Sequence, residues 1–72
     1  MAKLKRLSGA EVCAIMKRHG FDEVRRKGSH IVMQRRHSDS TCTVPVPDHP
    51  ELKAGTLAAI IRQSAIPRSE FE

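Results

Sequence analysis

The sequence predicts an α+β domain whose elements follow the order α-β-β-β-α. A complete helix-start signal lies near the N-terminus, an apolar stripe with helical spacing lies near the C-terminus, and three short β-like runs lie between them. The 72 residues leave room for one domain, residues 1–72, with a small core. We expect a three-stranded antiparallel sheet with two helices on one face and with the other face open to solvent or a ligand.

The first helix is predicted at about residues 8–19. Ser8 and Glu11 form a capping box, S-x-x-E, and Leu7 precedes the cap at the position of a hydrophobic staple. Gly20 is placed to end the helix in a left-handed conformation. The apolar face follows a spacing of three and four: Val12, Ile15, Met16 and His19.

Three β-like runs follow, at about residues 22–27, 30–36 and 41–46. Gly28 and Ser29 separate the first two, which predicts a two-residue hairpin turn in which the glycine supplies a positive φ. A polar turn at residues 37–40 joins the second run to the third. Pro45 is compatible with the third run if that strand is at the edge of the sheet.

The hairpin turn predicts which residues share a face. It pairs Lys27 with His30, Arg26 with Ile31, Arg25 with Val32, and Val24 with Met33. The inward set is then Val24, Ile31, Met33, Cys42, Val44 and Val46. Arg25, Lys27 and His30 point outward together, whereas Arg26 lies on the inward face near the turn, where it can reach past the sheet edge.

A second helix is predicted at about residues 56–66, with Thr56 as its N-cap after Gly55 and with Pro67 ending it. Its buried stripe comprises Leu57, Ile60, Ile61 and Ser64 or Ala65. A further turn near residues 69–71 would pack Phe71 back onto the core.

The composition limits the classes of partner. The net charge of +5 favours a polyanion, such as nucleic acid or an acidic protein. No apolar run approaches the ~20 residues that span a membrane, and the N-terminal cations precede no apolar stretch of the kind found in a secretory signal. We therefore expect a cytoplasmic protein in which Cys13 and Cys42 are reduced. Phe21 and Phe71 are the only aromatics, so contacts with nucleic acid would rely on charge and hydrogen bonds.

His30 is the strongest candidate for chemistry, because a histidine can give or take a proton near neutral pH. RNA carries its own nucleophile, the 2′-hydroxyl, so a ribonuclease needs only acid–base groups and cations for the phosphate. Lys27 and Arg25 would supply charge on the same face, and Ser29 could donate a hydrogen bond to phosphate. The competing interpretation is a solvated strand residue that follows an ordinary turn at Gly28.

Two further cations are candidate RNA contacts. Lys53 precedes Gly55 at a helix start, where free amides attract phosphate. Arg35 belongs to a second basic run in the strand that follows the hairpin turn. The histidines are scattered without metal-ligand spacing, and no phosphate-binding glycine loop occurs, so we expect neither a metal nor a cofactor.

Several motifs occur together in a fixed order: L-S-G-A-E at 7–11, H-G-F at 19–21, V-R-R-K-G-S-H at 24–30, T-V-P-V at 43–46, and L-K-A-G-T-L with I-I-R-Q-S-A-I within 52–66. This set resembles the HicA family of bacterial toxins, also called YcfA-like proteins, over nearly the whole chain. The resemblance implies a fold like that of double-stranded-RNA-binding domains. It also implies an mRNA interferase, a ribosome-independent endoribonuclease that arrests translation and growth. Because the sequence shows no metal-ligand set, we expect this reaction to be metal-independent.

The resemblance further implies a HicB-type antitoxin that covers the active site of the toxin. The family's catalytic histidine lies in a G-S-H motif, which matches Gly28, Ser29 and His30. One departure is that family members often have a histidine directly after V-P-V, where this chain has Pro47 and places His49 two residues later. Besides a ribonuclease that acts through His30, two alternatives stay open: a non-catalytic RNA-binding module, and a protein whose basic face only docks an acidic partner.

Overall fold

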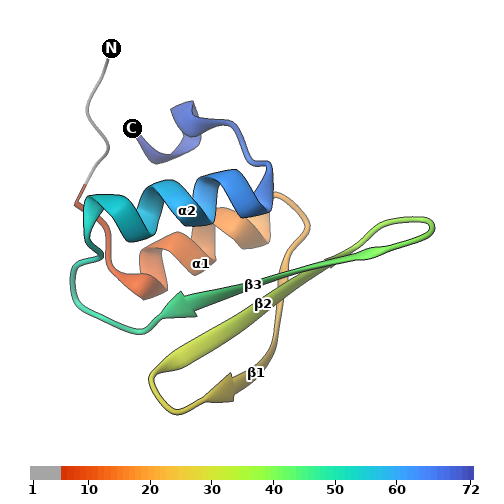
Figure 1. The fold of residues 1–72 in the computed structure, drawn as a ribbon, viewed down its shortest axis with the longest axis horizontal. Coiled ribbons are helices and arrows are strands. Elements are labelled where there is room, and N and C mark those ends of the chain that lie inside the picture. Colours follow the sequence, from red (N-terminus) through yellow and green to blue (C-terminus); the bar gives the residue numbers. More distant parts are fainter. Residues whose placement is uncertain (1–5) are drawn as a thin grey trace.

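A computed structural model describes residues 6–72 and shows the predicted α-β-β-β-α order (Figure 1). The elements are α1 (Gly9–Arg18), β1 (Asp22–Lys27), β2 (His30–Arg36), β3 (Thr41–Pro47), α2 (Ala54–Ser64) and a final 3₁₀ helix, η1 (Arg68–Phe71). We expected no secretory signal at the N-terminus. Residues 1–5 of that segment lie outside the part of the chain that the structure describes.

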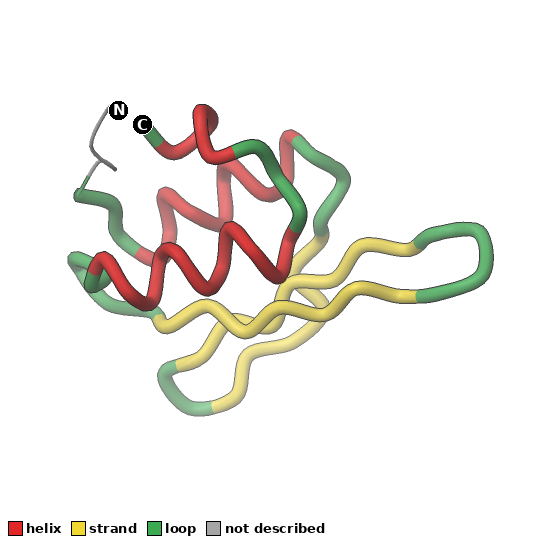
Figure 2. Tube along the Cα trace, turned by 45° about the horizontal axis from the view of Figure 1, so that its top comes forward, coloured by secondary structure: helices red, strands yellow, loops and turns green. Residues whose placement is uncertain are grey.

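The three strands form an antiparallel sheet in the order β1-β2-β3, with β2 in the centre. Both long helices lie on the same face of this sheet, and the turn between β2 and β3 extends away from them (Figures 1 and 2). The α+β class and the arrangement of the layers are therefore confirmed. Because β3 is an edge strand, Pro45 removes no hydrogen bond from a central strand.

The predicted signals at both ends of α1 are present. The Ser8 hydroxyl accepts a hydrogen bond from the Glu11 amide at 3.1 Å, and the Glu11 carboxylate accepts one from the Ser8 amide at 2.9 Å. At the other end Gly20 has a φ of +90°, and the Phe21 amide donates to the Met16 carbonyl at 3.0 Å. This Schellman geometry turns the chain so that Phe21 enters the core, where it is 1% exposed.

One core lies between the helices and the inward face of the sheet. Its fully buried side chains come from every element except β1: Val12, Met16, Met33, Val44, Val46, Leu57, Ser64 and Phe71, together with Phe21 before β1. The burial of Phe71 confirms that η1 packs back onto the domain. Ser64 is the buried polar side chain of this set, and its hydroxyl accepts a hydrogen bond from the Ile66 amide.

The prediction for Val24 is wrong. Glu23, not Val24, pairs with Met33, because a β-bulge between Glu23 and Arg25 leaves Val24 48% exposed. Strict alternation from the hairpin turn would have directed Phe21 away from the core. The bulge adds one residue, shifts the alternation and lets Phe21 face inward.

The prediction that Thr56 is the N-cap of the second helix is also wrong. Lys53 is the N-cap, its carbonyl accepts from the Leu57 amide at 2.9 Å, and α2 begins at Ala54. The chain enters the helix early because Leu52 is already fixed: it is buried, and its amide bonds to the Leu7 carbonyl. Thr56 consequently lies within the first turn of α2.

Candidate functional site

The turn between β1 and β2 places a lysine beside a histidine. Lys27 pairs with His30 across the turn, and Gly28 between them has a φ of +59°, as the sequence predicts. Arg25 pairs with Val32 and therefore lies on the same outward face as this pair. All three side chains are exposed, so a polyanion has free access to them.

Other contacts hold this turn against the segment that follows β3. The Asp48 amide donates to the Ser29 carbonyl at 2.6 Å, and the Arg26 guanidinium forms an ion pair with the Asp48 carboxylate. Arg26 therefore reaches past the sheet edge as expected, and its hydrogen bond with Asp48 raises its pKa further above the usual value. Arg26 positions the turn, which leaves Arg25 and Lys27 as the cations nearest His30 along β1.

His30 also lines a groove of about 400 Å³ between β3 and α2. Its lining residues are His30, Pro45, Pro47, Gly55, Thr56, Ala59, Ile60 and Gln63. Pro47 is the direct cross-strand neighbour of His30 on β3. Both residues line the groove, so a proline stands beside His30 at the position where the family resemblance led us to expect a histidine.

Lys53 is exposed and immediately precedes the residues of α2 that line the groove. Its side chain makes no capping hydrogen bond to the helix, so its ammonium group is available near the same surface. His30 thus belongs both to the turn, with Lys27 and Ser29, and to the groove, whereas Lys53 lies two residues before the groove residue Gly55.

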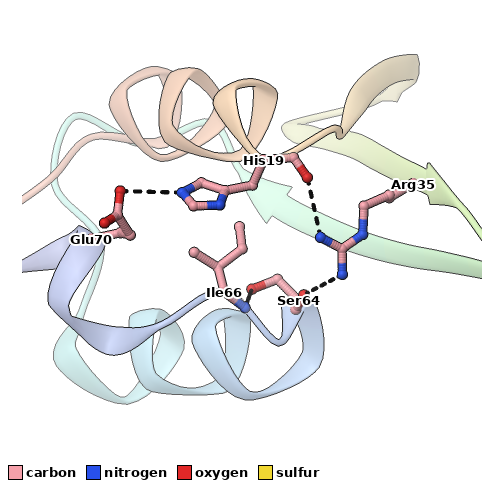
Figure 3. Close-up of polar contacts among 5 residues, drawn as sticks. All are labelled: His19, Arg35, Ser64, Ile66 and Glu70. Atoms are coloured by element: carbon pink, nitrogen blue, oxygen red, sulfur yellow. Dashed lines mark hydrogen bonds and ion pairs between the residues drawn. The ribbon is translucent and has the colours of Figure 1, made fainter.

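Arg35 does not join this region. It is five residues from His30 along β2, so its side chain points to the opposite face of the sheet. Its guanidinium donates to the His19 carbonyl at 3.1 Å and to the Ser64 carbonyl at 3.4 Å, at the C-terminal ends of α1 and α2 (Figure 3). It also lies over the Phe21 ring, 4.9 Å from the centroid. The expectation that Arg35 contacts RNA does not fit this placement.

His19 and His49 make contacts elsewhere in the domain. The ring of His19 contacts Glu70 of η1 at 3.2 Å (Figure 3), and the backbone carbonyl of His49 accepts from the Gly9 amide at 2.9 Å. Neither residue lines the groove. Within residues 6–72, no three His, Cys, Asp or Glu side chains are grouped closely enough to hold a metal ion. Over the same residues, no helix combines the length and apolarity needed to cross a membrane.

Sequence reasoning missed Thr56 and Gln63 as site residues. They are seven positions apart on α2, which places them on the same side of a helix, and this side faces β3 across the groove. The sequence offered only the spacing as a signal, because the position of α2 relative to β3 depends on tertiary packing.

The fold and the site define a class of protein: a small basic α+β domain that presents a histidine and several cations on a surface suited to a polyanion. A family model described as the HicA toxin of bacterial toxin–antitoxin systems matches residues 9–66. The chain therefore belongs to the HicA toxin family, and membership implies an antitoxin partner. A comparison with curated proteins found no significant match.

Proposed function

We propose that this HicA family toxin is a cytoplasmic endoribonuclease that cleaves mRNA and thereby arrests translation and growth. The observation that supports this most directly is the pairing of Lys27 with His30 on an exposed face, beside a groove that has no acidic lining residue. The proposal gives His30 the acid–base role and makes Lys27 the cation nearest the reacting phosphate.

The chemistry requires only groups that this surface offers. The 2′-hydroxyl of one ribose attacks the adjacent phosphorus, which forms a 2′-O–P bond and breaks the bond to the 5′-oxygen of the next nucleotide. His30 either removes the proton from the 2′-hydroxyl or gives one to the departing 5′-oxygen, and solvent water carries out the other proton transfer. Lys27 stabilises the negative charge that grows on the phosphate oxygens. The products are a 2′,3′-cyclic phosphate and a 5′-hydroxyl end.

We further propose that Arg25, Ser29 and Lys53 hold the RNA backbone on either side of the reacting phosphate. All three residues are exposed; Arg25 and Ser29 belong to the same hairpin as His30, and Lys53 immediately precedes α2, whose first turn lines the groove with His30. A HicB-type antitoxin that covers this surface would block access to His30 and compete with RNA. Such binding through backbone charges should weaken steeply as salt is added.

Induced expression of the wild type and of His30→Ala tests the proposal, combined with cleavage of single-stranded RNA by the purified proteins. The variant should lose both growth arrest and cleavage, and it should keep its fold, because His30 is exposed. His37→Ala is a matched control, since His37 is also exposed but lies in the distant turn between β2 and β3. Full cleavage by His30→Ala, or loss of wild-type cleavage in excess chelator, would contradict this mechanism.

A second candidate function is a non-catalytic RNA-binding module. Its support is that His30 is the one acid–base side chain among the residues lining the groove, with Pro47 directly opposite it. Under this alternative, wild-type protein binds single-stranded RNA without cutting it, and Lys27→Ala and His30→Ala weaken binding by similar modest factors.

A further inference from the structure

We infer that the groove between β3 and α2 is a subsite for one nucleobase of the bound RNA, and that Gln63 determines which base is preferred. This inference rests on the proposed RNA-binding role of the surface around His30. It adds a specificity site, on an element outside the hairpin, to a function that otherwise needs only charge and a histidine.

The groove leads away from His30 along α2. At one end His30 and Pro47 lie opposite each other on the strands, next to the first turn of α2 with Gly55 and Thr56. Because a helix rises 1.5 Å per residue, Gln63 lies about 10 Å further along the helix than Thr56. At this far end the Cys42 thiol donates to the Gln63 carbonyl at 3.2 Å, which fixes this part of α2 beside β3. A phosphate at His30 therefore places an adjacent base within reach of the groove.

The groove offers apolar walls that can pack against the two faces of a base and polar groups that can hydrogen-bond to its edge. Pro45, Pro47, Ala59 and Ile60 present apolar surface, against which a planar ring can pack in the absence of aromatic side chains. The Gln63 amide carries both donors and an acceptor and makes no side-chain hydrogen bond with the described residues. By contrast, the Gln34 amide on β2 already bonds to the Thr43 hydroxyl at 3.2 Å. Gln63 is thus available to pair with a ligand.

The charge around the groove favours a nucleotide as its occupant. None of the lining residues is acidic; the cation Lys27 pairs with His30, and the cation Lys53 precedes the first turn of α2, which lines the same groove. The volume of about 400 Å³ lies within the ~300–1,000 Å³ range of small-ligand sites, which is ample for a single base. An apolar peptide segment would fit the walls but would leave these cations without a partner. We therefore assign the groove to RNA.

The test compares wild type, Gln63→Leu and Gln34→Leu on a pool of single-stranded RNA with random sequence. Sequencing of the cleaved ends gives the base frequencies at each position around the cut. The wild type should show a preference at one position next to the cut, and Gln63→Leu should reduce that preference by roughly tenfold, since a good amide–base pair discriminates by about 1–3 kcal/mol. Gln34→Leu should leave both the preference and the cleavage rate unchanged.

A second measurement separates this inference from the proposed catalysis. The same RNA pool is bound to His30→Ala protein with and without Gln63→Leu, and the retained RNA is sequenced. If the wild type does not cleave but Gln63→Leu alters the retained sequences, the base subsite stands and the catalytic proposal fails. If the wild type cleaves and the profiles with and without Gln63→Leu coincide in both assays, the subsite is refuted and the catalytic proposal stands. An effect of Gln63→Leu on antitoxin binding alone would equally refute the subsite and assign the groove to the protein partner.

Discussion

Lys27 and His30 form the last cross-strand pair of the β1–β2 hairpin, separated along the chain only by Gly28 and Ser29. Opposite residues of an antiparallel pair have Cβ atoms about 4.5–5.5 Å apart and point to the same face. An ammonium group and an imidazole ring are consequently held within reach of one phosphate. The positive φ of Gly28 is what allows the turn to be this short.

Replacing Lys27 with Ala should reduce the rate of RNA cleavage roughly 10- to 100-fold. This range corresponds to the loss of one hydrogen bond to a charged group, about 1.5–3 kcal/mol. The fold should be retained, because Lys27 is exposed at the end of its strand. Initial rates on a short single-stranded RNA at fixed salt measure the effect.

Arg36→Ala is the matched control for this change. Arg36 is also exposed and positively charged, but it lies at the opposite end of β2 from His30. It should lower the cleavage rate by less than about threefold, as expected for the loss of a remote, screened charge. Equal losses in the two variants would mean that Lys27 contributes only to the overall charge.

Replacing Arg35 with Met should destabilise the domain by about 2 kcal/mol. The substitution removes hydrogen bonds to the His19 and Ser64 carbonyls and the contact with the Phe21 ring. It also removes a cation from a point where two helix C-termini meet, and such a cation interacts favourably with both helix dipoles. Urea unfolding followed by circular dichroism measures the change.

The comparison is with Arg36→Met, the exposed neighbour, which should change the free energy of unfolding by no more than about 0.5 kcal/mol. If the two variants were equally stable, the contacts of Arg35 with the helix ends would make no net contribution to the free energy of unfolding. The structural role assigned to Arg35 would then be incorrect.

Features with local causes could be predicted from the sequence. The capping box at Ser8, the left-handed Gly20 and the two-residue turn at Gly28 each depend on a few neighbouring residues, and all three are present. The turn length also set the register from Lys27 to Arg25. The position of Val24 could not be obtained in this way, because the bulge follows from the need to bury Phe21, which is decided by packing against distant elements.

The candidate site likewise has one half that the local sequence predicts and one half that depends on tertiary packing. The hairpin half, with Lys27 and His30, followed from the turn alone, whereas the groove half requires the packing of α2 against β3. For Arg35, the basic run indicated charge but not direction. The direction follows from its odd spacing from His30 along β2, which places Arg35 on the opposite face of the sheet.

Replacing Gly9 with Ala should destabilise the domain by at least about 2 kcal/mol. A Cβ atom at this position would lie 2.2 Å from the Pro47 carbonyl oxygen, so α1 and the segment after β3 must move apart. That movement also strains the hydrogen bond from the Gly9 amide to the His49 carbonyl. The melting temperature should fall by several degrees.

Gly55→Ala is the opposite case within α2. Apart from its chain neighbours and the adjacent helix backbone, no atom lies within 4 Å of the added Cβ, and alanine is the better helix former by up to about 1 kcal/mol. The melting temperature should therefore rise slightly. A similar response of the two glycine variants would show that close packing at Gly9 is not the controlling factor.

The stability contribution of Cys13 should depend on pH. Burial raises the pKa of the Cys13 thiol, and the nearby Glu23 carboxylate raises it further. The folded protein therefore keeps the proton at a pH where the unfolded chain has lost it. The stabilisation is complete below the unfolded pKa of about 8.5 and is lost as the pH rises towards the higher folded value.

Urea unfolding of wild type and Cys13→Ala between pH 7.5 and 10, under reducing conditions, measures this effect. The wild type should be more stable at pH 7.5, because alanine leaves a small cavity in the core. That advantage should shrink with rising pH, with a slope that cannot exceed about 1.4 kcal/mol per pH unit for one proton. Cys42→Ala, which alters the half-buried thiol on β3 instead, controls for the titration of other groups. A constant difference between wild type and Cys13→Ala across this range would show that burial does not hold the proton on Cys13.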